Sequence, residues 1–178
     1  IFYSQGIGVK QNHREALKWS RMAADQNDPD AQYNLGRIYG EGQGIPQDHR
    51  ESLKWIRKAA AQQHIPALLA LGWICEQGLG VKQDFEEAIK WYKQAAARGD
   101  VSALVRLGWI YEKGLGLDAD TAEAAKWYHK AAEQGLAFAQ VNLAFMFANG
   151  QGVEQDYKEA VKWFRKAAEQ GDADAQYD

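Results

Sequence analysis

Cysteine is almost absent from this chain of 178 residues, in which Cys75 is the only one. An isolated cysteine excludes disulfide pairing within the chain. A single unpaired cysteine fits a reducing compartment without proving one. The sequence alone leaves the compartment open between the cytoplasm and the periplasm or exterior.

Long apolar runs and an excess of basic charge are also missing. No stretch of about 18 apolar residues occurs, so the sequence predicts no membrane span. The formal net charge is −3, and the chain has no basic stripe of the kind that binds nucleic acid. We therefore expect no nucleic-acid partner.

Motifs of catalysis and of cofactor binding are missing as well. None of the serines (Ser4, Ser20, Ser52 and Ser102) starts Ser-x-x-Lys or lies in Gly-x-Ser-x-Gly. The histidines lack the spacing of metal ligands, and the glycine-rich stretch 40–44 lacks the Lys-Ser/Thr ending of a P-loop. The sequence predicts no catalytic residue, no metal site and no cofactor, and hence no enzyme.

What the sequence does contain is a repeat of 36 residues. Its marker is a tryptophan that follows a lysine and precedes an Ala-Ala pair by four residues. The tryptophans are Trp19, Trp55, Trp91, Trp127 and Trp163. A period in the range of roughly 20 to 50 residues means that each unit must stack on its neighbours to bury its apolar face. The sequence therefore predicts an all-α solenoid.

The units follow one another without insertion or deletion. We expect a single array with a partial unit at 1–27, complete units at 28–63, 64–99, 100–135 and 136–171, and a stub at 172–178. Because the chain begins and ends inside a unit, we expect it to be a fragment of a longer protein. Head-to-tail self-association through Phe2, Tyr3 and Tyr177 at the two ends is a further expectation.

The first helix of each unit, helix A, is predicted over about residues 29–41 of the first complete unit. Asp28 can cap the free N–H groups of the helix start, and Pro29 loses no hydrogen bond at the first helical position. Ala31, Leu35 and Ile38 then share one face. Gly42 follows, and glycine accepts the left-handed conformation just past a helix end.

The second helix, helix B, is predicted to start after Asp48. Asp48 and Glu51 have the spacing of a capping box, in which each side chain accepts a hydrogen bond from the backbone of the other. The pair recurs as Asn12/Glu15, Asp84/Glu87, Asp120/Glu123 and Asp156/Glu159. Helix B is expected to end near Gln63 in the first complete unit and at Gly99, Gly135 and Gly171 in the later ones.

Helix B is expected to bury its tryptophan together with small residues. Its predicted inward face in the first complete unit consists of Ser52, Trp55, Ile56, Ala59 and Ala60. On helix A, the position of Gly36 is occupied in later units by Gly72, Gly108 and Ala144, which predicts that nothing larger than a methyl group fits there. Cys75 stands where other units have an aromatic residue, so we expect a buried thiol.

These motifs resemble the Sel1-like repeat family, the 36-residue relatives of tetratricopeptide repeats. The resemblance covers the whole chain. Its carriers on helix A are Ala31, Tyr33, Leu35, Gly36, Tyr39, Gly42 and Gly44, and on helix B they are Asp84, Glu87, Ala88, Lys90, Trp91, Tyr92, Ala95 and Ala96. It implies a right-handed α-α superhelix that scaffolds complexes or docks proteins and peptides. Secreted cysteine-rich members staple helix pairs with disulfides, and a single cysteine places this chain outside that branch.

The side of helix A opposite its packed face is the predicted binding site. By the resemblance, this side lines the concave groove of the superhelix. One position there carries Arg37, Trp73, Trp109 and Phe145, and around it lie Tyr33, Glu76, Arg106, Glu112, Lys113 and Asn149. Two interpretations of the aromatic residues stay open: they fill space between adjacent A helices, or they form an exposed stripe that anchors a ligand.

Two functions follow from the second interpretation. The first is a non-enzymatic scaffold that binds a protein or a peptide along helix A, with a ligand whose identity the sequence does not give. The alternative is an envelope-associated adaptor for glycan or peptidoglycan, because aromatic side chains also stack on sugar rings. By the resemblance, such functions occur often in bacterial envelope assembly, secretion or host interaction, and in eukaryotes in endoplasmic-reticulum quality control; we expect a bacterial protein.

Overall fold

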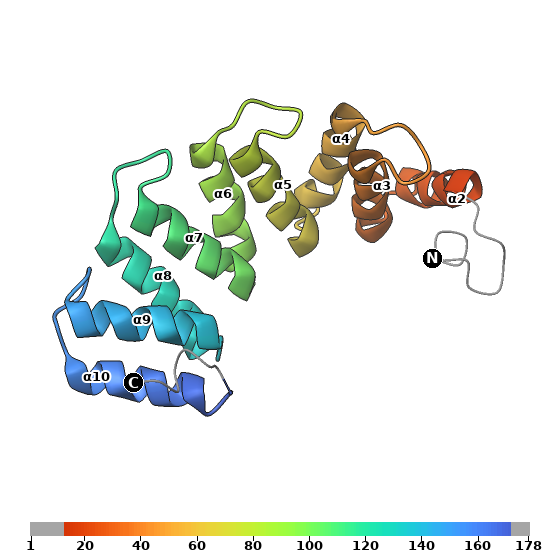
Figure 1. Cartoon of the computed structure of the whole chain (residues 1–178). Helices are drawn as coiled ribbons and strands as arrows, with labels where there is room; N and C mark the ends of the chain where they lie inside the picture. The colour runs from red at the N-terminus through yellow and green to blue at the C-terminus, as the bar shows by residue number, and fades with distance from the viewer. Residues whose placement is uncertain (1–12, 172–178) are drawn as a thin grey trace. The chain divides into compact units, whose positions relative to one another are not determined.

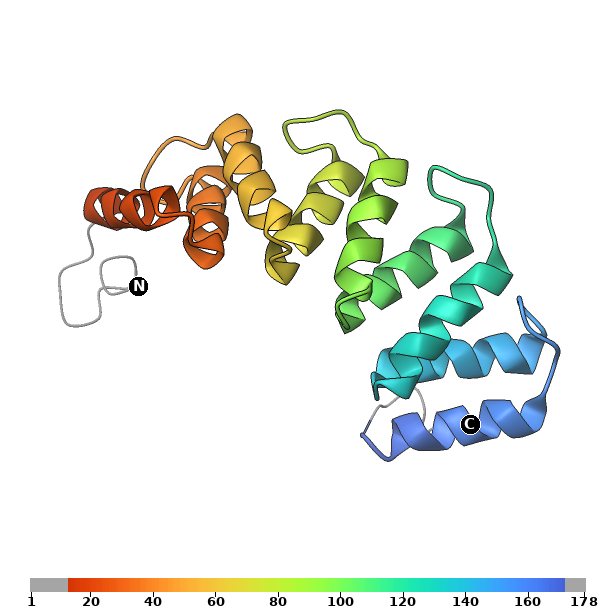
Figure 2. The same ribbon diagram turned by 180° about the vertical axis from the view of Figure 1, so that it is seen from behind.

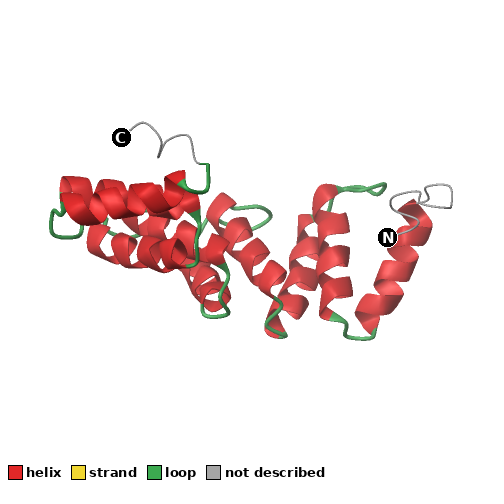
Figure 3. Ribbon diagram, turned by 90° about the horizontal axis from the view of Figure 1, so that it is seen from below, coloured by secondary structure: helices red, strands yellow, loops and turns green. Residues whose placement is uncertain are grey.

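The computed structural model describes residues 13–171. Within that range every regular element is a helix, drawn red in Figure 3, and green loops join the helices. The helices are α2 (His13–Asp25), α3 (Pro29–Glu41), α4 (His49–Ala61), α5 (Ile65–Gln77), α6 (Phe85–Ala96), α7 (Val101–Lys113), α8 (Thr121–Glu133), α9 (Ala137–Asn149) and α10 (Tyr157–Ala168). The prediction of an all-α fold is confirmed. Phe2, Tyr3, Tyr177 and the predicted stub at 172–178 lie outside the described residues.

The chain divides into two compact units, residues 1–91 and 92–178, with the division inside α6. In the first, α2 packs on α3, α3 on α4, and α4 on α5 (Figure 1). In the second, α7 packs on α8, α8 on α9, and α9 on α10, and the same order is seen from behind in Figure 2. In each unit, helices that are consecutive in sequence are neighbours in space, as expected for stacked helical repeats.

Helix A forms where the sequence predicts it, because both ends carry their signals. α3 runs from Pro29 to Glu41, and a carboxylate oxygen of Asp28 accepts from the backbone N–H of Ala31 at 2.7 Å. At the other end Gly42 is left-handed, with φ 68°, and its N–H donates to the Ile38 carbonyl. The next unit caps differently: His64 stands in place of the aspartate, and its ring accepts from the N–H of Ala67.

Helix B begins with only half of the predicted capping box. Asp48 accepts from the N–H groups of Arg50 and Glu51, as expected. The N–H of Asp48, however, donates to the carbonyl of Tyr39 in α3 at 2.8 Å, and Glu51 instead accepts from Lys54 at 2.9 Å. The reciprocal bond was therefore predicted wrongly, because a carbonyl at the end of helix A takes its place.

The same substitution occurs in the later repeats. The first residue of each pair donates its N–H to helix A, in the bonds Asp84 to Cys75, Asp120 to Tyr111, and Asp156 to Phe147. The glutamate of each pair binds a lysine one turn later, in Glu87–Lys90, Glu123–Lys126 and Glu159–Lys162. These bonds connect the start of every described helix B from α4 onward to the end of the preceding helix A.

Helices A and B approach most closely at the predicted small residue. A Cβ atom on Gly36 would lie 2.5 Å from Cγ1 of Ile56, and one on Gly108 would lie 2.8 Å from the ring of Tyr128. Real Cβ atoms essentially never approach other atoms this closely, so a methyl group at either position would force the neighbouring side chain to shift. At Ala144 the methyl group is accommodated, and the residue is fully buried.

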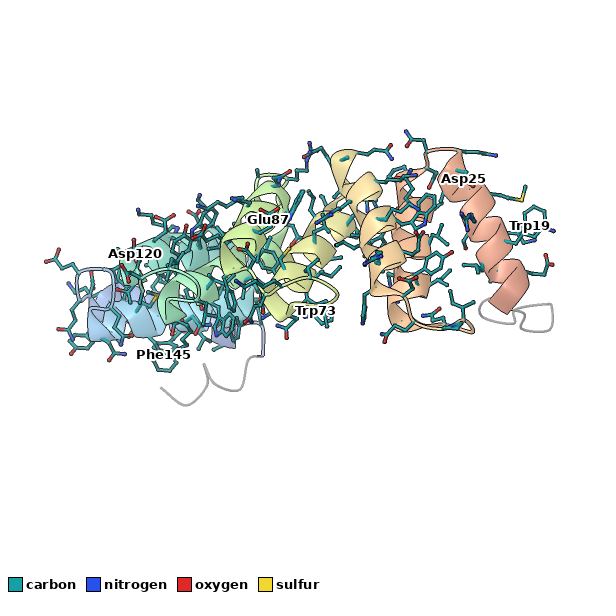
Figure 4. All side chains as sticks on the ribbon, turned by 90° about the horizontal axis from the view of Figure 1, so that it is seen from above. Trp19, Asp25, Trp73, Glu87, Asp120 and Phe145 are labelled. Atoms are coloured by element: carbon teal, nitrogen blue, oxygen red, sulfur yellow. The ribbon has the colours of Figure 1, made fainter. Side chains whose placement is uncertain are left out.

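The tryptophans of helix B are buried unevenly. Trp55 and Trp163 are buried, and Trp55 packs with Leu35 of α3 and Ala24 of α2. Trp19 is 51% exposed, and Figure 4 shows it projecting away from α2. The predicted core role is wrong for Trp19, which keeps about half of its surface in solvent.

Cys75 is buried in α5, as its repeat position predicts. Burial raises the pKa of its thiol, and the nearby carboxylates of Glu87 and Asp84 raise it further. A thiolate, the reactive form of cysteine, is therefore disfavoured at this position.

Gly108→Val should destabilise the protein by about 3 kcal/mol, because overpacking a helix contact costs about 1–3 kcal/mol and a β-branched residue adds a smaller helix penalty. Tyr128 cannot move aside easily, since its hydroxyl is bonded to Glu112 at 3.0 Å. Urea unfolding monitored by circular dichroism measures the change. The matched control is Ala122→Val at an exposed position of α8, expected within about 0.5 kcal/mol. Equal effects of the two substitutions would contradict the packing argument.

Gly135→Ala should lower stability by about 1 kcal/mol, because the φ of Gly135 is 87° and an L residue is strained there. No atom lies within 4 Å of a Cβ built at Gly135, so the loss would come from the backbone alone. Gln134→Ala, one residue earlier at φ −79°, is the control and should change little. An unchanged melting temperature for Gly135→Ala would show that the strain is absent.

Candidate functional site

Aromatic side chains lie exposed at one repeated position of helix A. Trp73 of α5 is 47% exposed, Phe145 of α9 is 44% exposed, and Trp109 of α7 is half-buried. One residue further along α5 and α7, Ile74 and Ile110 are buried. Because successive helical residues point about 100° apart, the packed face and the exposed face of helix A are separated within each turn.

In the first compact unit, the predicted site residues meet different surroundings. Tyr33 is half-buried, with its ring 5.2 Å from the ring of His64. Arg37 is exposed and forms an ion pair with Glu41 at 2.9 Å. Trp73 keeps about half of its surface in solvent. Tyr33, Arg37 and Trp73 thus each present some surface to solvent.

Glu76 does not belong to this exposed surface. It is only 2% exposed, and one of its carboxylate oxygens accepts from the side-chain amide of Gln77 at 3.1 Å. At the equivalent position of the preceding repeat, a Cβ on Gly40 would lie 2.7 Å from Oγ of Ser52 in α4. This position of helix A therefore faces helix B, and the prediction that Glu76 lines the open side was wrong.

In the second compact unit, Arg106 and Trp109 line a pocket at the side of α7. Its other walls are Ser102 and Val105 of the same helix and Leu136 and Phe138 at the start of α9, and its volume is about 410 Å³. The guanidinium carbon of Arg106 lies 5.9 Å from the centre of a Trp109 ring, a distance at which a cation is attracted to the ring face. We call this space the α7–α9 pocket.

Glu112 and Phe145 line a second, smaller pocket of about 290 Å³. The hydroxyl of Tyr128 donates to Glu112 at 3.0 Å, and Nζ of Lys113 lies 2.6 Å from the other carboxylate oxygen. Burial raises the pKa of Tyr128, and the charge of Glu112 and the hydrogen bond to it raise it further. The Glu112 carboxylate is thus already held by two groups of this chain.

The remaining predicted residues of this unit lie at the surface. Phe145 packs edge-to-face on Phe164 of α10, with ring centres 5.0 Å apart, and still projects beyond the ribbon in Figure 4. Lys113 and Asn149, at the ends of α7 and α9, are exposed. Of the six predicted residues in this unit, two line each pocket.

Sequence reasoning missed three residues of helix A. His64 caps α5, and its Nε2 lies 2.9 Å from Asp30. Leu136 and Phe138 line the α7–α9 pocket and are 37% and 55% exposed. Comparing the start of helix A across the repeats would have found Leu136, which replaces a capping residue, and Phe138, which stands two residues further along.

Neither a metal-binding cluster nor a transmembrane helix is seen in the part of the chain that the structure describes. Among these residues, no three His, Cys, Asp or Glu side chains gather as a metal site would require. None of the described helices has the length and apolar character of a transmembrane helix.

The fold and the repeated sequence define a helical repeat protein. The chain belongs to the Sel1 repeat family: the family model of the Sel1 repeat matches residues 1–28, 29–64, 65–100, 101–136 and 137–172. Proteins of this family generally act as scaffolds for protein interactions and are generally non-catalytic.

Solved structures show the same fold. One is c5321, a protective antigen present in uropathogenic Escherichia coli strains, with 40% identity and a TM-score of 0.91 over 99% of this chain and 38% of that one. A Sel1 repeat protein from Oxalobacter formigenes has 41% identity and a TM-score of 0.83, over 98% and 71% of the two chains. This chain thus spans well under half the length of c5321. A search of curated proteins finds no match.

Cysteine-rich protein B of Helicobacter pylori is more distant. It has 26% identity and a TM-score of 0.53, over 70% of this chain and 94% of that one.

Leu136→Ser should stabilise the protein by roughly 1 kcal/mol, the usual gain from a side chain that caps a helix. The backbone of Leu136, with φ −75° and ψ 111°, nearly matches that of Asp100, which caps α7, but α9 lacks a side-chain cap. Thermal unfolding followed by circular dichroism measures the change. Leu136→Ala, which removes the exposed leucine without adding a cap, is the control. A gain of equal size in both variants would show that capping is not its cause.

Proposed function

We propose that the chain is a non-enzymatic interaction module that binds a protein segment on the exposed side of its A helices. The observation that carries the proposal is the exposure of large aromatic side chains, Trp73 and Phe145 above all, at one repeated position. Apolar side chains left in solvent at a shared position are typical of interaction surfaces, and tryptophan is enriched among the residues that dominate binding energy.

The arrangement of the helices supports this use. The packed face of helix A is occupied by contacts with helix B, as at Gly108 and Tyr128. Changes on the exposed face leave those contacts intact, so its residues can differ between repeats. They do differ: Arg37 occupies the position that Trp73 and Trp109 occupy in the next two repeats.

Each compact unit carries residues of its own on the exposed side of helix A. The first contributes Trp73, with Tyr33 and Arg37 as polar and aromatic contacts; the second contributes Trp109, Phe145 and the two pockets. Arg106, Glu112, Lys113 and Asn149 make this side polar, and Glu112 is already held by Tyr128 and Lys113. Their mixture of charges suits a protein segment better than a polyanion.

The test uses a peptide selected from a random library displayed on phage, with the whole chain as the target. We expect Trp73→Ala or Trp109→Ala to weaken its binding by roughly 30-fold, which corresponds to about 2 kcal/mol for a dominant interface residue. Isothermal titration calorimetry measures the affinity, and circular dichroism checks that the helices persist.

The matched control is Val161→Ser, because Val161 is 47% exposed but lies on α10, a B helix. It should leave the affinity unchanged. Unchanged affinity in both tryptophan variants would refute the proposed surface. Preferential binding to soluble peptidoglycan fragments, lost in the same variants, would refute the protein ligand in favour of a glycan.

A further inference from the structure

The last complete repeat departs from the others at the start of its helix A. At the capping position, Asp28, His64 and Asp100 each accept a hydrogen bond from a backbone N–H of their own helix. Leu136 stands there in α9 and makes no side-chain cap. This repeat therefore lacks the capping hydrogen bond and has in its place the apolar side chain of Leu136, which is 37% exposed.

Two residues further along, the same repeat departs again. The equivalent positions hold Asp30, Pro66 and Ser102, all exposed, whereas α9 holds Phe138, which is 55% exposed. Neither Leu136 nor Phe138 is part of the buried core, because both side chains keep a large part of their surface in solvent. The other repeats serve as an internal comparison, and they show that the fold does not need apolar residues here.

Leu136 and Phe138, the two residues that differ from the other repeats, line the same space, the α7–α9 pocket. Val105 and Trp109 face them from α7, so four of its six lining residues are apolar. Its volume of about 410 Å³ falls in the range of roughly 300 to 1,000 Å³ that is usual for sites holding small ligands or single large groups. Such a lining is suited to a bulky apolar side chain.

The charged residue of the pocket is Arg106. The equivalent positions hold Asn34, Ala70 and Asn142, so a cation occurs here in only one of the complete repeats. A guanidinium beside an apolar pocket favours a carboxylate close to the apolar group, since arginine can bind both carboxylate oxygens.

We propose that the α7–α9 pocket holds a large apolar side chain of a protein segment while Arg106 binds a carboxylate adjacent to it. This inference rests on the proposed function and specifies its ligand at one position. A sugar would need several polar side chains for its hydroxyl groups, and the walls offer only Ser102 and Arg106. The apolar lining therefore favours a protein segment over a glycan.

The test titrates the whole chain with three small probes, observed by two-dimensional NMR of the backbone amides and the Trp109 indole. The probes are N-acetylphenylalanine, which carries the carboxylate, its uncharged amide, and N-acetyllysine amide. We expect N-acetylphenylalanine to shift residues 102–109 and 136–138, the amide to bind about tenfold more weakly, and the lysine compound not to bind.

Two variants assign these effects to the pocket. Leu136→Ser with Phe138→Ser replaces both apolar residues, supplies a cap and adds no charge. Circular dichroism checks that the variant is folded, and binding should weaken at least about tenfold. Arg106→Gln should abolish the preference for the carboxylate and leave the binding of the amide. Val161→Ser, on α10, should change neither.

The inference is overturned if N-acetylphenylalanine causes no shifts, if the double variant binds it as well as the native chain, or if chitin oligosaccharides or lipid vesicles shift the same residues more strongly. Its failure is distinct from failure of the proposed function. A library-selected peptide that loses affinity in Trp73→Ala but keeps it in the double serine variant would refute the pocket and leave the interaction surface standing.

Discussion

The close approach of helix A to helix B is the constraint on which the rest of the structure depends. At Gly108 the ring of Tyr128 lies where a side chain would be, and at Gly36 the side chain of Ile56 does the same. Contact at this distance brings apolar groups directly against the helix backbone, where dispersion and burial act together. In the last complete repeat, Ala144 stands at this position and its methyl group is fully buried.

Hydrogen bonds at the loop set the register of this contact. The N–H of Asp120 donates to the carbonyl of Tyr111, while its side chain caps α8. One residue thus ties the end of helix A to the start of helix B and satisfies polar groups that a helix end leaves open. The glutamate three residues later is released from capping and pairs with a lysine in water, where such a pair contributes only about 0.2–0.5 kcal/mol.

With helix B packed on one side, the opposite side of helix A makes fewer packing contacts, and Phe145 on Phe164 is one of them. The substitutions Arg37, Trp73, Trp109 and Phe145 occur there, whereas the packed positions vary little. The structure favours the exposed interpretation for Trp73 and Phe145, which keep nearly half of their surface in solvent. Departures from the repeat, rather than the repeat itself, carry the information about a ligand, and Leu136 and Phe138 are the clearest of them.

The sequence by itself determined the period, the helix boundaries and the buried face, because those depend on spacing and on local capping by residues such as Asp28 and Gly42. It also predicted that Gly36 and Gly108 are places of close approach. Only the tertiary structure decided which long side chains remain in solvent. Glu76 and Trp73 lie three residues apart on one helix, yet one is buried and the other exposed, because burial depends on the neighbouring helix. The pocket likewise joins residues of α7 and α9 that are about thirty positions apart, a proximity that follows from how successive helix pairs pack and that helical periodicity within one repeat does not contain.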